Sequence, residues 1–429
     1  MNYFKLLVFF LSLFPLVNSI LFLLKGKINT AVAFYPIFFL LYPIHLAFDI
    51  FFGVPDYPKK FYNFSVAIEN ESVVIIYLVY IFLIILLIWF LQHGSKTKVS
   101  DFFSNNRKIN SNVKRIFILA LSLFSFYFLV SPNPEDYLYY GKIRNVVDEL
   151  SSFDPIYLSY GRVSFYSMIS AFFILIARVL LGKECSWEMR AWLLFLLLVN
   201  IYVNNKRLIM AFLPLFYLVE FLIVGGKNGS IKKVIFSLIC FAVTYYLYAI
   251  YIKIDSSTID DELIYFYLRH ELGRDDVIMF VINHKILLGR DIMDYSGQSF
   301  VSSLMNYVPR FLYEDKPYPY GQYLTNSLIY GDIGPALIGW TVTTSILDEF
   351  LANFGVLGFV CGPIFIIGYC KYTDTINSPI YKLLFIFLMM LLFLVHTSLY
   401  AALVYICLLY FLKNSLMKFF TAIGCIKRT

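Results

Sequence analysis

The chain is built largely from repeated apolar blocks of roughly 15 to 23 residues, each long enough to cross a bilayer as a helix. In lipid, a spanning segment must satisfy its own backbone hydrogen bonds, which favours helices. With 60% hydrophobic and 15% charged residues, the chain lies outside the composition of soluble domains, in which about 25% of residues are charged. The sequence therefore predicts an all-α polytopic membrane protein.

Hydropathy predicts about 11 transmembrane helices in a single polytopic domain over residues 1–429. The first block has no small-residue cleavage site before Lys25, so we expect a retained span rather than a signal peptide. The expected spans cover residues 6–24, 31–52, 73–91, 116–130, 163–181, 191–203, 208–224, 234–251, 346–367, 383–395 and 400–412.

Loop charge sets the expected sidedness. Segment 92–115 holds six Lys or Arg residues against one acid, Asp101, which places it in the cytoplasm by the positive-inside rule. Alternation of the spans then places segments 132–162 and 255–341 outside. Residues 255–341 are thus expected to form one long, partly helical extracytoplasmic loop between the eighth and ninth spans.

Charge and cysteine usage exclude several classes of protein. The net charge of +7 comes from short basic clusters between spans, which argues against nucleic-acid binding. The six cysteines form no CxxC pair, so neither a disulfide framework nor a zinc site is expected. The outer loops contain no Asp-x-Asp motif. We therefore expect no metal and no cofactor.

Lys206 and Arg207 lie between two closely spaced apolar blocks, and alternation places both cations on the outer face. If the two blocks are wrongly bounded, these residues are ordinary cytoplasmic flanks. Otherwise they bind an anion at the outer leaflet, because an interfacial arginine is costly unless paired.

The long loop is expected to contain two helices. Residues 262–282 alternate apolar and charged residues at helical spacing, which predicts an amphipathic helix that breaks at Gly273. A second helix is expected over residues 299–308, ending before Pro309. The loop should therefore fold rather than act as a linker.

Residues 309–321 are expected to be extended, because Pro317 and Pro319 restrict the backbone. This segment would present two cations, Arg310 and Lys316, beside three tyrosines: Tyr313, Tyr318 and Tyr320. Cations among aromatic rings suit a ligand that carries sugar rings and phosphate. The alternative is an interfacial tyrosine belt with solvated charges.

Glu349 is the first candidate for a general base, because an ionisable residue near the bilayer suggests a functional site. Its alternative role is that of a solvated acid at the outer end of a span. His270 is the second candidate, and His284 and His396 are further ones. A single histidine in such a context is also compatible with a purely structural role.

The loop pattern resembles the oligosaccharide repeat-unit polymerases, the Wzy-type O-antigen polymerases of bacterial inner membranes. The residues that carry this resemblance are Arg274-Asp275-Asp276, Leu288-Gly289, Val308-Pro309-Arg310, Lys316-Pro317, and Glu349 with Asn353-Phe354-Gly355. Arg310 and Gly321 also show the R-x10-G spacing discussed for these enzymes. The short Lys206-Arg207 turn and the Lys25-Gly26-Lys27 turn fit the family as well.

The resemblance implies glycosyl transfer at the outer leaflet of the bacterial inner membrane, with the long loop in the periplasm. A glycan on undecaprenyl pyrophosphate would be the donor, and a hydroxyl of a lipid-linked repeat unit would be the acceptor. The implied partners are these lipid-linked oligosaccharides, membrane lipid, a chain-length regulator and a flippase. Cations would stabilise the pyrophosphate leaving group, and the tyrosines would bind sugars. The implied cations are Lys206, Arg207, Arg274, Arg310 and Lys316, and the implied bases are Glu349 and then His270.

Two other functions remain open. An O-antigen ligase uses the same donor and differs in its acceptor. A lipid-linked oligosaccharide flippase, or another transporter, is expected to show paired halves and ionisable residues deep in its spans, whereas these spans carry few charges. A chain-length regulator with a large coiled-coil region is excluded by the span pattern.

Overall fold

The computed structural model describes residues 1–94, 97–98, 111–139, 142–143, 146, 154–182, 185–204, 207–210, 212–224, 236, 239, 265–266, 269, 273–306, 308–338, 341–394, 405 and 407–412. These residues are mostly helical, and the two short strands β1 (Lys27–Ile28) and β2 (Thr97–Lys98) pair with each other. The chain forms two compact units. Unit 1 comprises residues 1–23, 28–96 and 259–429, and unit 2 comprises residues 24–27 and 97–258.

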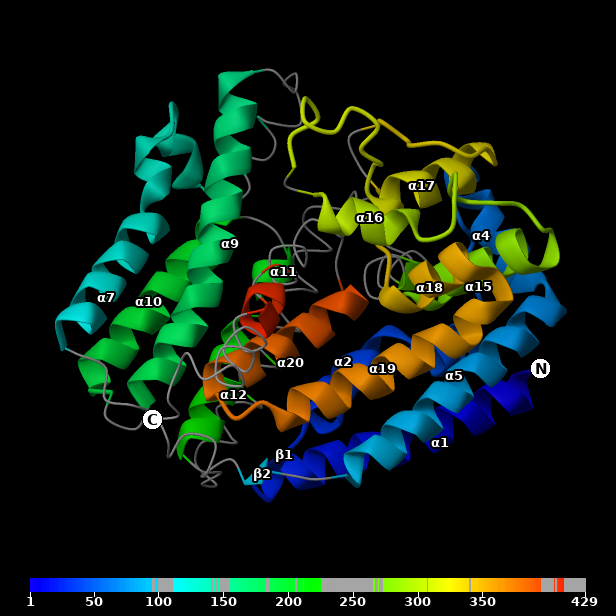
Figure 1. Ribbon diagram of the computed structural model, residues 1–429, viewed down its shortest axis with the longest axis horizontal. Helices are drawn as coiled ribbons and strands as arrows, with labels where there is room; N and C mark the ends of the chain where they lie inside the picture. Colours follow the sequence, from blue (N-terminus) through cyan, green and yellow to red (C-terminus); the bar gives the residue numbers. More distant parts are fainter. Residues whose placement is uncertain are drawn as a thin grey trace, which may run out of the picture. The chain divides into compact units, whose positions relative to one another are not determined.

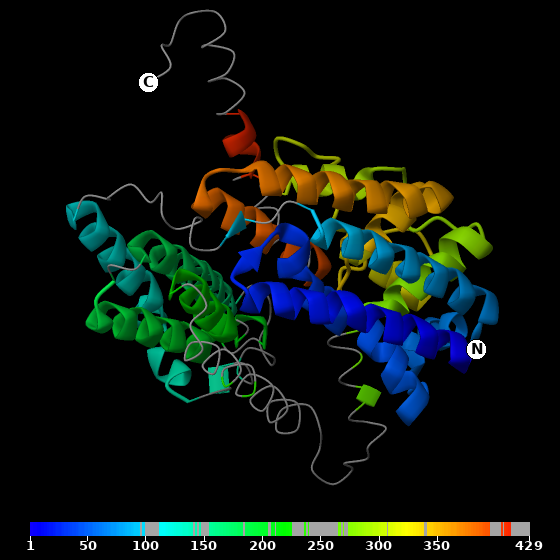
Figure 2. The ribbon, with the colours of Figure 1, turned by 90° about the horizontal axis from the view of Figure 1, so that it is seen from below.

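Unit 1 combines the N-terminal helices with the C-terminal third of the chain (Figure 1). In Figure 2, α1 and α19 run lengthwise through this unit. Its N-terminal helices are α1 (Asn2–Leu24), α2 (Thr30–Leu41), α3 (Pro43–Phe52), α4 (Tyr62–Glu69) and α5 (Glu71–Gln92). Its C-terminal helices are α15 (Asp275–Val281), α16 (Gln298–Leu304), α17 (Tyr320–Tyr330), α18 (Ile346–Phe354), α19 (Gly358–Thr375) and α20 (Pro379–Leu394).

The second predicted span is broken into α2 and α3. Asn29 caps the start of α2 by accepting a hydrogen bond from the Val32 N–H at 2.9 Å. Proline has no backbone N–H and is favoured at the first position of a helix, so the chain starts a new helix at Pro43. A carbonyl near this break is then available to another part of the chain, and Leu41 O accepts the backbone N–H of Arg274 at 3.1 Å.

Unit 2 contains α7 (Ser111–Ser125), α9 (Pro155–Leu181), α10 (Trp187–Asn204), α11 (Arg207–Met210) and α12 (Phe212–Val224). Helices α7, α10 and α12 pack against α9 (Figure 1). Asp154 caps α9 through the Ile156 N–H at 2.8 Å, with Pro155 at the first helical position. Arg178, near the other end of α9, forms an ion pair with Glu220 of α12 and donates to Gly182 O at 2.7 Å.

A buried polar seam joins the helices of unit 2. We call Ser125, Ser164, Ser167, Ser170, Asn200 and Asn204 the serine–asparagine seam. Asn200 Nδ2 donates to Ser125 Oγ at 2.8 Å, and Asn204 Nδ2 donates to Ser167 Oγ at 2.7 Å. All six side chains are buried and uncharged. Hydrogen bonds between small polar side chains are a common means of joining helices in a membrane.

Five helical segments in the described part of the chain are long and apolar enough to cross a membrane. They are Asn2–Leu24, Thr30–Phe52, Glu71–Gln92, Pro155–Leu181 and Ile346–Thr375, with shorter apolar helices at Ile116–Ser125, Phe212–Phe221 and Tyr381–Phe393. The predicted helical, membrane-type fold is therefore confirmed at this level. The predicted span 234–251 lies mostly, and the span 400–412 partly, outside the described residues, and the total of about 11 spans stays a prediction.

Candidate functional site

Four charged side chains form a buried ion chain within unit 1: Lys5, Asp49, Arg269 and Asp275. Lys5 Nζ lies 3.1 Å from Asp49 Oδ2, while Arg269 binds Asp49 through Nη1 and Asp275 through Nη2. Arg269 and Asp275 are fully buried, and Lys5 and Asp49 are each only 8% exposed. These four buried charges are thus paired with one another, as buried charges in a membrane protein require.

A tight turn brings Arg269 next to Asp275. Gly273 N donates to Arg269 O at 2.6 Å, and a Cβ on Gly273 would lie only 2.5 Å from that oxygen. Only glycine fits so close to the Arg269 carbonyl. Gly273 therefore lies between the described helical residues 265, 266 and 269 and α15, as the sequence predicts. The turn places Arg274, which is 4% exposed, immediately before α15.

Asp276 adds a carboxylate beside the ion chain. Its Oδ2 accepts from the Tyr57 hydroxyl at 3.3 Å, and its Oδ1 accepts from the Val277 N–H at 2.8 Å. Burial, with the neighbouring charge of Asp275, raises the pKa of Asp276 to about 7. Asp276 therefore titrates near neutral pH, whereas an exposed aspartate is fully ionised there.

Two acids begin α18, and both are buried rather than solvated. Asp348 is fully buried and Glu349 is 2% exposed, so the alternative of a solvated acid at the outer end of a span is wrong. Asp348 forms a capping box with Ser345, whose N–H donates to Asp348 Oδ1 at 2.7 Å. The two adjacent acids thus differ in role: Asp348 caps the helix, and Glu349 lies in its first turn.

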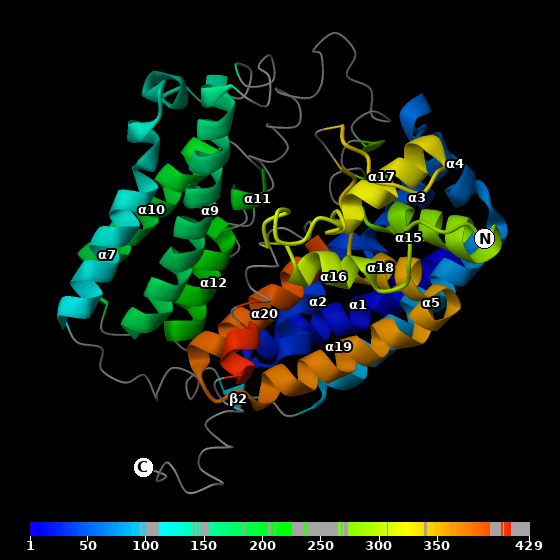
Figure 3. The same ribbon diagram turned by 45° about the horizontal axis from the view of Figure 1, so that its top comes forward.

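Asn353, one turn after Glu349, joins α18 to the start of α16. Its Nδ2 donates to Glu349 O and to Ser299 Oγ, both at 2.7 Å, and its Oδ1 accepts from Gly297 N at 2.8 Å. Gly297 has φ of 88°, a backbone conformation that favours glycine. Figure 3 shows α15, α16, α17 and α18 gathered on one side of unit 1. The predicted loop therefore packs on α18 through specific hydrogen bonds.

Residues 309–316 fold as successive turns rather than as part of the predicted extended segment. Leu312, Tyr313 and Lys316 each donate a backbone hydrogen bond to the residue three positions earlier. Lys316 Nζ donates to Asn306 O at 2.7 Å and to Val308 O at 3.0 Å. These hydrogen bonds hold Lys316 against the residues that precede the turns. The helix before it, α16, ends at Leu304, four residues earlier than expected.

Arg310 and Tyr318 lie together in this turn. The Arg310 guanidinium lies 4.0 Å from the centre of the Tyr318 ring, and its Nη1 donates to Lys316 O at 2.8 Å. Such cation–π contact orients the guanidinium while leaving it exposed. Lys316, by contrast, uses its ammonium to hold the turn.

Tyr320 is fully buried at the start of α17, and its hydroxyl donates to Asp348 O at 3.4 Å. Of the predicted site residues, Arg274 and Glu349 belong to helices that pack against each other: Arg274 immediately precedes α15, and Glu349 lies in α18. Arg310, Lys316 and Tyr318 form the separate turn. His270, Lys206 and His396 lie outside the described residues, and Arg207 begins α11 without a described side chain.

Sequence reasoning missed Lys5, Asp49 and Arg269, which complete the ion chain. A signal was present, because a charge inside an apolar block implies a partner elsewhere. The partner could not be identified, since Lys5 and Asp49 are 44 positions apart and Asp49 and Arg269 are 220 positions apart. In the described part of the chain, no group of His, Cys, Asp and Glu residues could hold a metal ion.

No model of a known protein family matches the chain, and neither a curated protein nor a solved structure matches it.

Proposed function

We propose that this protein is a membrane glycosyltransferase that polymerises lipid-linked oligosaccharide repeat units in the synthesis of O-antigen or a related surface polysaccharide. The donor is a glycan on undecaprenyl pyrophosphate. The acceptor is a hydroxyl of a lipid-linked repeat unit. The observation that carries this proposal is the buried carboxylate of Glu349 on α18. Helix α18 packs against α15, and the buried Arg274 immediately precedes α15. A base and a cation in one unit suit proton removal and charge stabilisation.

In the proposed reaction, the acceptor oxygen forms the new glycosidic bond while the bond to pyrophosphate breaks. Glu349 takes the hydroxyl proton, and Arg274 stabilises the negative charge on the departing pyrophosphate. Arg310, exposed on Tyr318, binds phosphate or sugar at the surface turn, with Lys316 and Tyr320 positioning this segment. His270 remains a further candidate base, and Lys206 and Arg207 remain candidates for binding an anion at the outer leaflet.

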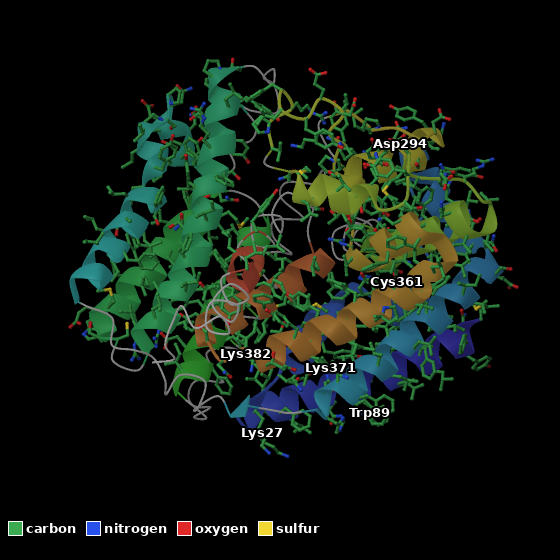
Figure 4. All side chains as sticks on the ribbon, in the orientation of Figure 1. Lys27, Trp89, Asp294, Cys361, Lys371 and Lys382 are labelled. Atoms are coloured by element: carbon green, nitrogen blue, oxygen red, sulfur yellow. The ribbon has the colours of Figure 1, made fainter. Side chains whose placement is uncertain are left out.

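Sidedness supports the same proposal. Asp294 lies at one end of unit 1, whereas Lys371 and Lys382 lie toward the opposite end (Figure 4). Lysines flanking spans are typical of the cytoplasmic side. The long loop, residues 255–341, is therefore proposed to face the periplasm of a bacterial inner membrane, in a single domain of about 11 spans.

The test is the surface-glycan ladder of a strain that lacks this gene, complemented with wild type, Glu349→Gln, Arg310→Ala or the control Glu314→Gln. Glu314 is exposed on the same turn as Arg310. We expect a core that bears one repeat unit in the deletion strain. Wild type and Glu314→Gln should restore the ladder, and Glu349→Gln and Arg310→Ala should not, at equal protein levels. A full ladder with Glu349→Gln would remove Glu349 from the catalytic role.

A lipid-linked oligosaccharide flippase is the second candidate, and the buried ion chain favours it, because transporters place paired ionisable residues among their spans. Deletion of a flippase would leave the core without any repeat unit and leave the lipid-linked intermediate on the cytoplasmic face. Deletion of a ligase would also leave a bare core, but with polymer accumulating on the lipid carrier. The ladder and the lipid-linked fraction together distinguish the three functions.

A further inference from the structure

Several buried polar atoms beside the ion chain have no hydrogen-bond partner among the described residues. They are both ring nitrogens of His45, the hydroxyl of Tyr77, Nε of Arg269 and Oδ1 of Asp275. All four side chains are fully buried. Each buried polar group without a hydrogen-bond partner lowers the stability of the folded protein by about 1–3 kcal/mol. Buried polar atoms in native proteins are therefore nearly always hydrogen-bonded to protein or to ordered water.

These atoms belong to one cluster rather than to scattered sites. His45 interacts electrostatically with Asp275, Arg269 and Asp49. Tyr77 interacts with the same three charged residues. The cluster therefore draws on α3, α5, residue 269 and the start of α15, all within unit 1. We call His45, Tyr77, Arg269 and Asp275 the buried polar cluster.

The chemistry of the cluster identifies what would satisfy it. Arg269 Nε can only donate, and the Asp275 carboxylate, which pairs with Arg269, can only accept. The Tyr77 hydroxyl does both, and a neutral His45 offers one donor and one acceptor. An anion would accept hydrogen bonds from the donors only, and a metal cation would bind the acceptors only. Water donates and accepts equally well.

We propose that the buried polar cluster binds ordered water molecules inside unit 1. These waters complete the hydrogen bonding of His45, Tyr77, Arg269 and Asp275 and solvate the ion chain that runs from Lys5 to Asp275. Buried waters typically make two to four hydrogen bonds to groups that protein leaves unmet. Hydration at this point also lowers the cost of keeping four charges away from bulk solvent.

The experiment is radiolytic labelling of the purified full-length protein in lipid nanodiscs, followed by mass spectrometry of individual tyrosines. X-rays split water into hydroxyl radicals, so a buried side chain is oxidised quickly only where a water molecule lies beside it. Tyr35 supplies a matched control, because it is also fully buried in unit 1 but its hydroxyl donates to Ser12 O at 2.7 Å. We expect Tyr77 to be oxidised several-fold faster than Tyr35.

A second variant tests whether the waters belong to this cluster. His45→Phe removes two polar atoms and adds apolar volume, so the oxidation rate of Tyr77 should fall toward that of Tyr35, while Tyr35 itself is unchanged. Equal oxidation rates of Tyr77 and Tyr35 in the wild-type protein would overturn the proposal, and this comparison needs no variant to fold. A Tyr77 rate that His45→Phe leaves unchanged would also contradict it. Neither result depends on the enzymatic activity of the protein.

Discussion

The ion chain of unit 1 and the serine–asparagine seam of unit 2 differ in charge and in the sequence separation of the segments they join. In unit 1, the ion chain joins full charges from segments far apart in the sequence: Lys5, Asp49, Arg269 and Asp275. In unit 2, the serine–asparagine seam joins α7, α9 and α10, which follow one another along the chain, through neutral hydrogen bonds. The ion chain thus fixes distant segments to one another through charge, whereas the seam joins its helices through neutral hydrogen bonds.

The two arrangements differ in what they lose when one member is removed. A neutral seam loses a hydrogen bond, and the remaining groups can find alternative partners. An ion chain that loses its central cation leaves charges buried without compensation, which is far more costly. The two arrangements also differ in how stability should depend on pH. The six seam residues have no titratable side chain, whereas Asp276, beside the ion chain, has one.

The largest effect is expected from Arg269→Met. This change leaves Asp275 buried without its cation and leaves Asp49 with Lys5 and the Tyr265 hydroxyl, so we expect a loss of about 3–5 kcal/mol in stability. The thermal unfolding midpoint in a fixed detergent measures it, with Arg290→Met at an exposed position as the control. Adding Asp275→Asn to Arg269→Met should recover part of the loss. No recovery, or a loss as small as that of the control, would contradict the role of the ion chain.

An intermediate, pH-dependent effect is expected from Asp276→Asn. Burial and the charge of Asp275 raise the pKa of folded Asp276 to about 7, above its ordinary value of 3.8. Between these values the folded protein holds more protons than the unfolded chain, so the contribution of Asp276 to stability is present below about pH 4 and is lost as the pH rises to about 7. The difference in pKa limits this contribution to about 4 kcal/mol.

Unfolding midpoints measured from pH 5 to pH 8 test this prediction. The wild-type midpoint should fall with rising pH relative to that of Asp276→Asn, so the variant should be the more stable protein at pH 8. Asp332→Asn, at an exposed position, serves as the control and should follow the wild type. Parallel curves for wild type and Asp276→Asn would show that Asp276 has no raised pKa.

The smallest effect is expected from Asn200→Leu in the serine–asparagine seam. Asn200 gives up its hydrogen bonds to Ser125 and to Leu196 O, but no charge is left behind. Hydrogen bonds between membrane helices contribute about 0.6–2 kcal/mol, so the shift in unfolding midpoint should be modest and independent of pH between 5 and 8. The control is Leu198→Ala, at a position that is 46% exposed. A loss as large as that of Arg269→Met would remove the contrast between the two units.

The sequence by itself determined the class of fold and the positions of the long apolar helices. The expected spans 6–24 and 73–91 correspond to α1 and α5 within four residues at each end, because hydrocarbon thickness alone fixes how long such a helix must be. The predicted break at Gly273 is confirmed, whereas the new helix that begins at Pro43 was not predicted, because hydropathy shows a single continuous block there. Glu349 could be singled out as an acid at the edge of a span.

The tertiary structure alone decided which charges meet. Pairing of Lys5 with Asp49, and of Asp49 with Arg269, depends on packing of segments that no periodicity connects. It also decided that Asp348 and Glu349 are buried, and that Lys316 binds backbone carbonyls instead of projecting from a strand. The physical reason is range: backbone preferences and hydropathy act over a few residues, whereas burial and ion pairing depend on neighbours brought together only by the complete fold.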